Sequence, residues 1–340
     1  MATLTNLTVN DTGFIRLPSG GSAARPGSPT VGMIRYNTDL ASNEYYNGSA
    51  WISVAPQTVG STSTGGSIAT TGGYRIHTFT SGSATFVPTL TGVVEVLVIA
   101  GGGAGHAIGG GGGAGGYQFI SGVPVVAGTS YPTVVGTGGV NPAGHSSNAG
   151  NPGNPSTFGG STPVSIVSTG GGKGGHYPPG TTNASGGSGG GGSGWNGGPE
   201  TFHAGYEGTA GQGHPGGFGV HYNGTPTGTH YGGGGGGGAG NRGYGRSNRF
   251  QQGRGGEGMA SNIGGTVTWR GGGGGGGTHT APSNAAYSLA GRGSDGNNLP
   301  GQPGSPGGTN NGGGGGGGNH GSPDVSGSGG SGVVIVRYRG

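Results

Sequence analysis

The sequence predicts a mostly β protein with little or no α-helix: a small N-terminal β module, then a β-sandwich that carries a large inserted bundle of polyglycine II helices. Three observations lead to this fold class. Glycine supplies 101 of the 340 residues, while only 27% are hydrophobic and 6% are charged. The β-branched and aromatic runs gather towards the two ends of the chain, and three runs of seven glycines lie between them. Because apolar burial cannot order the middle of such a chain, backbone hydrogen bonding has to do so.

The first 57 residues have a nearly ordinary composition and predict a small β module. Its strand candidates, bounded by turn residues, are Phe14–Leu17, Met33–Asn37 and Tyr45–Val54. The polar link Thr38–Asn43 suits a hairpin between the second and third of these. A module of this size buries little surface, so we expect it to pack against copies of itself or against another protein.

After a Ser/Thr/Gly-rich linker expected over residues 58–72, one glycine-rich domain is predicted from residue 73 to residue 340. Residues 73–168 and 332–340 are expected to form the strands of the sandwich, and residues 169–331 the glycine-rich insertion. The strand candidates are β-branched or aromatic runs between turn residues: Tyr74–Phe79, Thr85–Val87, Val93–Ala100, Tyr117–Ile120, Val123–Ala127, Tyr131–Val135, Val164–Val167 and Gly332–Tyr338. Because the last run differs so strongly from the residues before it, we expect it to return to the sheet that Val93–Ala100 begins.

The three glycine runs are 232–238, 271–277 and 312–318, and their first residues lie 39 and 41 positions apart. A polyproline-II-type helix has three residues per turn and no internal hydrogen bonds, so its backbone groups can bond sideways to neighbours. A run of glycine alone can be surrounded on every side. Segments with glycine at every third position, such as 150–155 and 301–307, can press only one face against a neighbour.

We therefore expect the glycine runs inside the bundle and the triplet segments on its outer layer. The structural positions that follow from this are Gly232, Gly235, Gly238, Gly271, Gly274, Gly277, Gly312, Gly315 and Gly318. A collagen helix is excluded because the triplets persist for only a few repeats. Disorder is the simpler alternative for a glycine-rich chain, but typical disordered chains carry far more charge.

Two parts of the chain resemble known families. The segments Leu17–Gly20, Arg25–Asn37 and Tyr46–Trp51 resemble a module that is common in phage tail fibres and related virion proteins. The resemblance implies that this module attaches the chain to other virion proteins and forms a homo-oligomer, a trimer.

The second resemblance is carried by Tyr74–Phe79, Val94–Ala100, Gly115–Tyr117 and Gly329–Tyr338, which resemble a glycine-rich domain of phage and environmental bacterial proteins. The layout is also similar to the glycine-rich ectodomain of anaplastic lymphoma kinase receptors, where polyglycine helices are inserted into a jelly-roll-like sandwich. The cysteines and kinase of those receptors are absent, so a signalling role is not implied. Some phage tail-tip adhesins likewise hold receptor-binding loops on polyglycine II layers, which implies an adhesin-like role here.

Large polar and aromatic side chains concentrate in the loops between the glycine runs. Such groups on a rigid frame suit the binding of a host cell-surface glycan or outer-membrane protein. The alternative is that they merely cover the sides of the bundle. The receptor-binding candidates are Trp195, Phe202, His203, Tyr206, Phe218, His221, Tyr222, Tyr231, Arg246, Arg249, Phe250, Trp269 and Tyr287.

Other chemistry finds little support in the sequence. No nucleophile and base occur in a recognisable catalytic context, so we expect no enzyme and no cofactor. None of the ten histidines has the spacing of a helical ligand pair, and although His221 and His230 could meet across a loop, no metal site is expected. The segment Asn241–Gly256 resembles an RNA-binding RGG box, but 13 basic residues in 340, with a net charge of +4, do not form a general nucleic-acid surface.

The N-terminal residues Met1–Thr5 lack the basic and apolar regions of a signal peptide, and no apolar run has the length of a membrane span. We therefore expect a protein made in a host cytoplasm and carried in the virion, without membrane insertion. The leading hypothesis is a phage fibre or appendage that binds a host surface. The alternatives are a structural spacer or decoration protein of the virion, an ice-binding or extracellular matrix protein, and an RNA-binding protein.

Overall fold

The computed structural model divides the chain into two compact units, Met1–Gln57 and Thr58–Gly340, which are treated separately. The structure describes residues 16–40, 42–53, 62–106, 109–141, 150–160, 164–176, 184–194, 201–225, 228–245, 253–277, 304–318 and 325–340. These residues form eighteen strands and one 3-10 turn, and they contain no α-helix. No helix that could cross a membrane occurs among them. The prediction of a mostly β chain is confirmed.

The first unit contains a four-stranded sheet in the order β1-β2-β3-β4. Its strands are β1 (Ser19–Gly20), β2 (Ile34–Asn37), β3 (Ser42–Tyr46) and β4 (Trp51–Ser53). The strands β2 and β3 pair antiparallel, so a hairpin is present as predicted, but its link is shorter than Thr38–Asn43 because Ser42 and Asn43 belong to β3. The prediction of one strand over Tyr45–Val54 is wrong: a turn with Gly48 at a φ of 104° separates β3 from β4. The described end of the predicted strand Phe14–Leu17, residues 16–17, is not in a strand.

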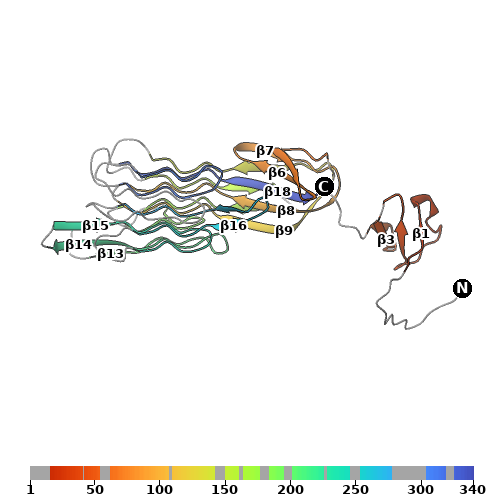
Figure 1. Cartoon of the computed structure of the whole chain (residues 1–340), viewed down its shortest axis with the longest axis horizontal. Helices are drawn as coiled ribbons and strands as arrows, with labels where there is room; N and C mark the ends of the chain where they lie inside the picture. The colour runs from red at the N-terminus through yellow and green to blue at the C-terminus, as the bar shows by residue number, and fades with distance from the viewer. Residues whose placement is uncertain are drawn as a thin grey trace, which may run out of the picture. The chain divides into compact units, whose positions relative to one another are not determined.

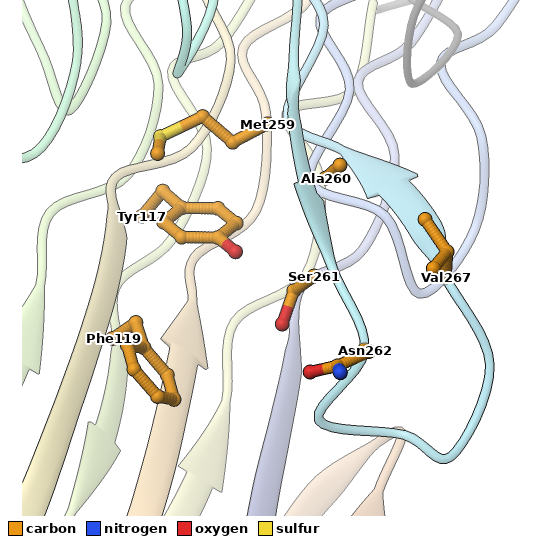
Figure 2. A pocket seen from close by; sticks show the side chains of 7 residues that line it. All are labelled: Tyr117, Phe119, Met259, Ala260, Ser261, Asn262 and Val267. Carbon is orange, nitrogen blue, oxygen red and sulfur yellow. The ribbon is translucent and has the colours of Figure 1, made fainter.

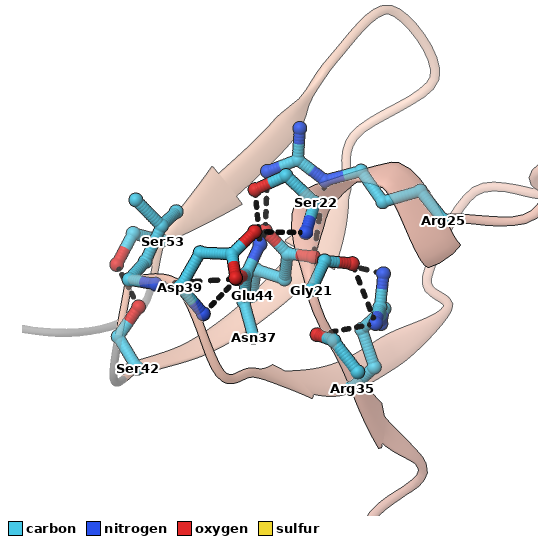
Figure 3. A network of polar contacts seen from close by, with 11 residues as sticks. Gly21, Ser22, Arg25, Arg35, Asn37, Asp39, Ser42, Glu44 and Ser53 are labelled. Atoms are coloured by element: carbon cyan, nitrogen blue, oxygen red, sulfur yellow. Dashed lines mark hydrogen bonds and ion pairs between the residues drawn. The ribbon is translucent and has the colours of Figure 1, made fainter.

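The buried face of this sheet is polar (Figure 3). The carboxylate of Glu44 is fully buried and accepts hydrogen bonds from Nε and Nη2 of Arg25, at 3.1 and 2.6 Å. The side-chain amide of Asn37 donates to the same carboxylate at 3.0 Å, and the guanidinium of Arg35 pairs with it at 3.5 Å. The hydrogen bonds from Arg25 lower the pKa of Glu44, so the carboxylate stays ionised inside the unit.

The opposite face of the sheet is apolar and exposed. Along β2, the buried Arg35 and Asn37 alternate with Ile34 and Tyr36, which are 52% and 38% exposed. Ile34 lies directly opposite Tyr45, which is 39% exposed. An ordinary half-buried strand turns its apolar residues inward, so this unit has the reverse arrangement.

The second unit contains a five-stranded antiparallel sheet in the order β5-β6-β18-β8-β9. Its strands are β5 (Ser67–Thr71), β6 (Tyr74–Phe79), β8 (Gly92–Ile99), β9 (Tyr117–Val125) and β18 (Val333–Arg339). The C-terminal strand β18 pairs with β8, from Val333 opposite Ile99 onward. The predicted return of the chain to this sheet is therefore confirmed.

Two predictions fail in this sheet. Residues 58–72 are not simply a linker, because Ser67–Thr71 form the edge strand β5 along β6. The two strands expected over Tyr117–Ile120 and Val123–Ala127 are the single strand β9, whose register shifts where Val94 and Val96 of β8 pair with it. A bulge lets one strand carry both segments.

A four-stranded sheet in the order β12-β11-β10-β7 lies against the five-stranded sheet. Its strands are β7 (Gly82–Phe86), β10 (Tyr131–Val135), β11 (Ser156–Phe158) and β12 (Ile166–Ser168). The two sheets share a hydrophobic core in which Phe86 and Phe158 are fully buried beside Val96, Val98 and Val336. The sequence did not predict β11, which follows a proline-containing segment.

The other face of the five-stranded sheet is covered by a hairpin of β16 (Met259–Ser261) and β17 (Thr268–Arg270). Between these strands Ile263 is buried against Leu97, Ile99 and Ile335. The centre of the sheet is therefore buried on both faces, which explains why β8 is almost continuously apolar rather than alternating.

Extended glycine segments run away from the strand ends of the two sheets (Figure 1). We call these laterally bonded segments the glycine array. The array includes residues earlier than the predicted insertion 169–331, since the N–H of Gly101 donates to Asn154 and that of Gly103 donates to Gly113. The predicted boundary at residue 168 is therefore wrong, because strand β8 passes directly into the array.

The run 232–238 illustrates how the array is bonded. Its six amides from residue 233 to residue 238 donate to carbonyl oxygens of three neighbouring segments in turn, at 2.8 to 3.0 Å, and every third amide returns to the same segment. Residues 233 and 236 donate to segment 271–277, residues 234 and 237 to segment 189–192, and residues 235 and 238 to segment 241–244.

The carbonyl groups of the same run accept from three further segments. These donors lie in 253–256, 111–114 and 214–217, again with a period of three. Six segments thus surround one run of glycine. A Cβ atom built on Gly236 would collide with the carbonyl oxygen of Gly112, and one on Gly235 with that of Arg254. The neighbours leave no space for a side chain.

A small three-stranded sheet lies at the end of this unit that is farthest from the two large sheets (Figure 1). It consists of β13 (Thr201–His203), β14 (Gly219–Thr225) and β15 (Gly228–Gly232), paired antiparallel in that order. The sequence did not predict these strands, which are short and rich in glycine and polar residues.

Candidate binding surface

The small sheet presents an aromatic side chain on one face. Side chains alternate along a strand, so Phe202 and its neighbour His203 point to opposite faces of β13. Phe202 is 63% exposed. Its ring centroid lies 5.9 Å from that of Phe218, which directly precedes β14 and is 41% exposed. The structure therefore brings together two of the predicted receptor-binding residues.

The ring of Phe218 lies against the backbone of Gly245, because a Cβ at Gly245 would collide with that ring. Tyr244, which precedes Gly245 in the chain, is 36% exposed. Its hydroxyl donates to Oε1 of Glu257 at 3.1 Å and accepts from Nδ2 of Asn241 at 3.3 Å. The guanidinium of Arg254 lies 5.7 Å from the centre of the tyrosine ring. Partial burial raises the pKa of Tyr244, and the hydrogen bond to Glu257 raises it further.

We call this group of side chains the aromatic strip: Phe202, Phe218 and Tyr244 with Asn241, Arg254 and Glu257. The segments that carry it are neighbours, since the N–H of Gly243 donates to Pro215 and that of Tyr244 donates to Arg254. Tyr244 and the three polar members were not among the predicted site residues. Their spacing could have indicated the site, because Asn241 and Tyr244 lie three residues apart, as do Arg254 and Glu257. In a helix with three residues per turn, the members of each pair lie on the same face.

Four other candidates lie mostly inside. His221 is only 2% exposed, and its ring lies 5.4 Å from that of Tyr231 on the neighbouring strand. Burial raises the pKa of Tyr231 and lowers that of His203. Tyr206 is half-buried, with its ring close to Gly175. These positions favour packing within the unit over contact with a receptor.

The remaining candidates do not join the aromatic strip. Trp269 is 50% exposed, but it lies on β17 opposite Ala260, beside the large sheets. Tyr222 belongs to β14, opposite His230 of β15. The other five candidates lie outside the described residues: Trp195, Arg246, Arg249, Phe250 and Tyr287.

All nine glycines predicted to have a structural role are buried, and they are Gly232, Gly235, Gly238, Gly271, Gly274, Gly277, Gly312, Gly315 and Gly318. The triplet segments are more exposed. In segment 304–307, for example, Gly304 and Gly307 are buried, whereas Ser305 and Pro306 between them are exposed.

An apolar groove runs between β9 and the β16–β17 hairpin (Figure 2). Its volume is about 390 Å³, and it is lined by Tyr117, Phe119, Met259, Ala260, Ser261, Asn262 and Val267. Phe119, Met259 and Val267 are 47%, 42% and 71% exposed. Within the described residues, no three histidine, aspartate or glutamate side chains form a cluster suited to a metal ion.

Comparison with protein families gives a match to the second unit. The family model described as a glycine-rich domain matches residues 78–339, which include both large sheets except β5 and part of β6, together with the whole array. No curated protein matches the chain significantly.

Proposed function

The chain belongs to the glycine-rich domain family, and on that premise we propose that it is a fibre or appendage protein of a phage virion whose second unit is a rigid body that binds a host surface. The observation that carries this proposal is the aromatic strip, in which exposed side chains stand on a backbone bonded into the glycine array. Exposed aromatic groups on a fixed backbone bind a partner with little loss of conformational entropy. The proposed role is binding, without catalysis or a cofactor.

For the rigid body we propose polyglycine II helices inserted into a jelly-roll-like sandwich. Supporting this are the six neighbours of run 232–238 and its three-residue period of hydrogen bonding. In the three glycine runs, only the first residues of two, Gly271 and Gly312, have φ in the left-handed region. The other residues are therefore compatible with the hand of a polyproline-II-type helix.

For the first unit we propose attachment to other virion proteins and assembly as a homotrimer. The support is its exposed apolar face, on which Ile34, Tyr36 and Tyr45 lie side by side while the interior is polar. Exposed apolar groups gathered in this way on a small unit are typical of an interaction surface. The proposed site of synthesis is a host cytoplasm and the proposed location is the virion.

Cell binding by the purified full chain tests this function. We expect labelled protein to bind saturably to some strains of a panel of Gram-negative and Gram-positive bacteria, and to be a trimer by mass photometry. The variant Tyr36→Ser/Tyr45→Ser should be monomeric and bind more weakly through loss of multivalency. A trimer that binds no strain would indicate a spacer or decoration protein, and a wild-type monomer would contradict the proposed assembly.

A further inference from the structure

The aromatic strip combines apolar and polar groups that lie close together. Phe202 and Phe218 supply exposed apolar ring faces. Beside them, Tyr244 holds the carboxylate of Glu257 and the amide of Asn241 at hydrogen-bonding distance from its hydroxyl. Flat apolar faces next to fixed polar groups match a ligand that is itself apolar on one face and polar at its rim.

Sugar rings have this character. The axial C–H groups of a pyranose form an apolar face that stacks on aromatic rings, while its equatorial hydroxyl groups both donate and accept hydrogen bonds. The carboxylate of Glu257 accepts from such hydroxyls, the guanidinium of Arg254 donates to them, and the amide of Asn241 does both. From this match we propose that the aromatic strip binds successive sugar rings of a bacterial surface polysaccharide. The inference rests on the proposed function and narrows the receptor to a glycan.

A protein receptor fits these observations less well. Protein partners usually bury a few large side chains in desolvated pockets at the centre of the interface. The three rings of the aromatic strip are themselves 36% to 63% exposed, and the guanidinium of Arg254 stands beside the ring of Tyr244. An elongated, hydroxyl-rich chain can contact such exposed groups without entering a cavity.

The backbone beneath the aromatic strip is fixed by the array. The N–H of Tyr244 donates to the carbonyl of Arg254 at 2.8 Å, and the carbonyl of Tyr244 accepts from the N–H of Gly235, in the run 232–238, at 3.0 Å. The glycine at position 245 lets the ring of Phe218 lie against the main chain. A prearranged surface loses little entropy on binding, which matters for sugars because each hydroxyl must also give up its water.

An array of immobilised bacterial polysaccharides and oligosaccharides, probed with the full-length chain, tests the inference. We expect binding to a subset of glycans, reduced at least tenfold by Phe218→Ala and by Tyr244→Ala, and two- to fivefold by Tyr244→Phe, which keeps the ring but removes the hydroxyl. The matched control is Phe119→Ala, which removes an aromatic residue of β9 that is 47% exposed, against 41% for Phe218, and should leave binding unchanged. Thermal unfolding of each variant shows whether the fold is retained.

The outcomes separate this inference from the proposed function. If the wild-type chain bound no glycan above the level of the Phe218→Ala/Tyr244→Ala variant, yet adhered to cells in a way abolished by protease treatment, the receptor would be a protein and the glycan inference would be overturned. If Phe119→Ala weakened glycan binding as much as Phe218→Ala, the site would not be the aromatic strip. A chain that adheres to no cells contradicts the proposed function itself.

Discussion

The large sheets and the glycine array of the second unit share the same lateral backbone hydrogen bonding, but the space between their layers is occupied differently. In both, the backbone donates and accepts sideways between neighbouring segments, and β8 passes from one into the other at Ala100. In the sheets, side chains such as Leu97 and Phe86 fill the space between layers. In the array the same space is closed by the approach of the backbones themselves. Removing side-chain atoms should therefore destabilise the sheets, whereas adding side-chain atoms should destabilise the array.

The largest effect is expected for Gly236→Val in the centre of the array. Its new Cβ would meet the carbonyl oxygen of Gly112, and separating the segments would break hydrogen bonds to several neighbours at once. We expect a loss of more than about 4 kcal/mol, enough to prevent cooperative folding of the unit. Chemical denaturation followed by near-UV circular dichroism measures it.

The matched control is Gly160→Ala, at an exposed glycine whose nearest atoms to a new Cβ are those of Pro132, at 3.8 Å and beyond. This change should alter the free energy of unfolding by no more than about 0.5 kcal/mol. Equal effects at both positions would contradict the claim that close backbone approach, rather than glycine content, orders the array.

The second-largest loss of stability is expected when a buried side chain is removed from the core of the sheets. Phe86→Ala removes a fully buried ring that contacts Phe158, Tyr131 and Tyr338, with centroid distances of 6.1 to 6.4 Å. We expect a loss of about 3 to 5 kcal/mol, from lost apolar burial and a residual cavity. The same denaturation measurement applies. A loss below about 1 kcal/mol would mean that the array, and not this core, stabilises the sheets.

The two regions also differ in how far the sequence predicted them. Tyr74–Phe79 and Tyr131–Val135 were predicted as strands with the bounds of β6 and β10, because β-branched and aromatic residues alternate between clear turn signals. Strand β5 was missed since Ser67–Thr71 has almost no large apolar residue and is exposed throughout. It pairs with β6 across the turn Gly72–Gly73, in which both glycines have positive φ, so only this turn in the sequence could have indicated the strand.

In the array, burial of the glycine runs followed from geometry, because only glycine can be surrounded on all sides. Which segments surround a given run could not be predicted. Glycine has no side chain that distinguishes one run from another, and the pairing depends on how distant loops fold. For the same reason the contact of Tyr244 with Glu257 was missed, although the three-residue spacing of Asn241 and Tyr244, and of Arg254 and Glu257, is visible in the sequence.

A third prediction concerns pH, to which the sheets should respond through a buried histidine. His77 is fully buried, with Nδ1 at 2.7 Å from the carbonyl oxygen of Gly65 and Nε2 at 2.9 Å from the hydroxyl of Tyr338. Burial lowers its pKa below the ordinary value of 6.5. The unfolded chain therefore binds a proton first as pH falls below 6.5, and stability should decrease there by up to about 1.4 kcal/mol per pH unit.

Melting temperatures between pH 7.5 and pH 5 test this for the wild type and for His77→Gln, which cannot be protonated. The variant should show the flatter profile, while His203, whose pKa is also lowered, contributes equally to both. Parallel profiles would show that His77 carries no part of the pH dependence.

The smallest change in stability is expected at Asn154 in the outer segment 150–155, next to Gly153, where a much larger change is expected. Asn154 is exposed, and its side chain donates to Oγ1 of Thr137 at 2.8 Å. Asn154→Ala should therefore change the free energy of unfolding by about 0.5 kcal/mol or less. The preceding Gly153→Ala should cost about 2 kcal/mol or more, because its Cβ would collide with the carbonyl oxygen of Gly101. Scanning alanine through this segment should give a penalty at every third residue, and a penalty at every second residue would indicate β pleating instead.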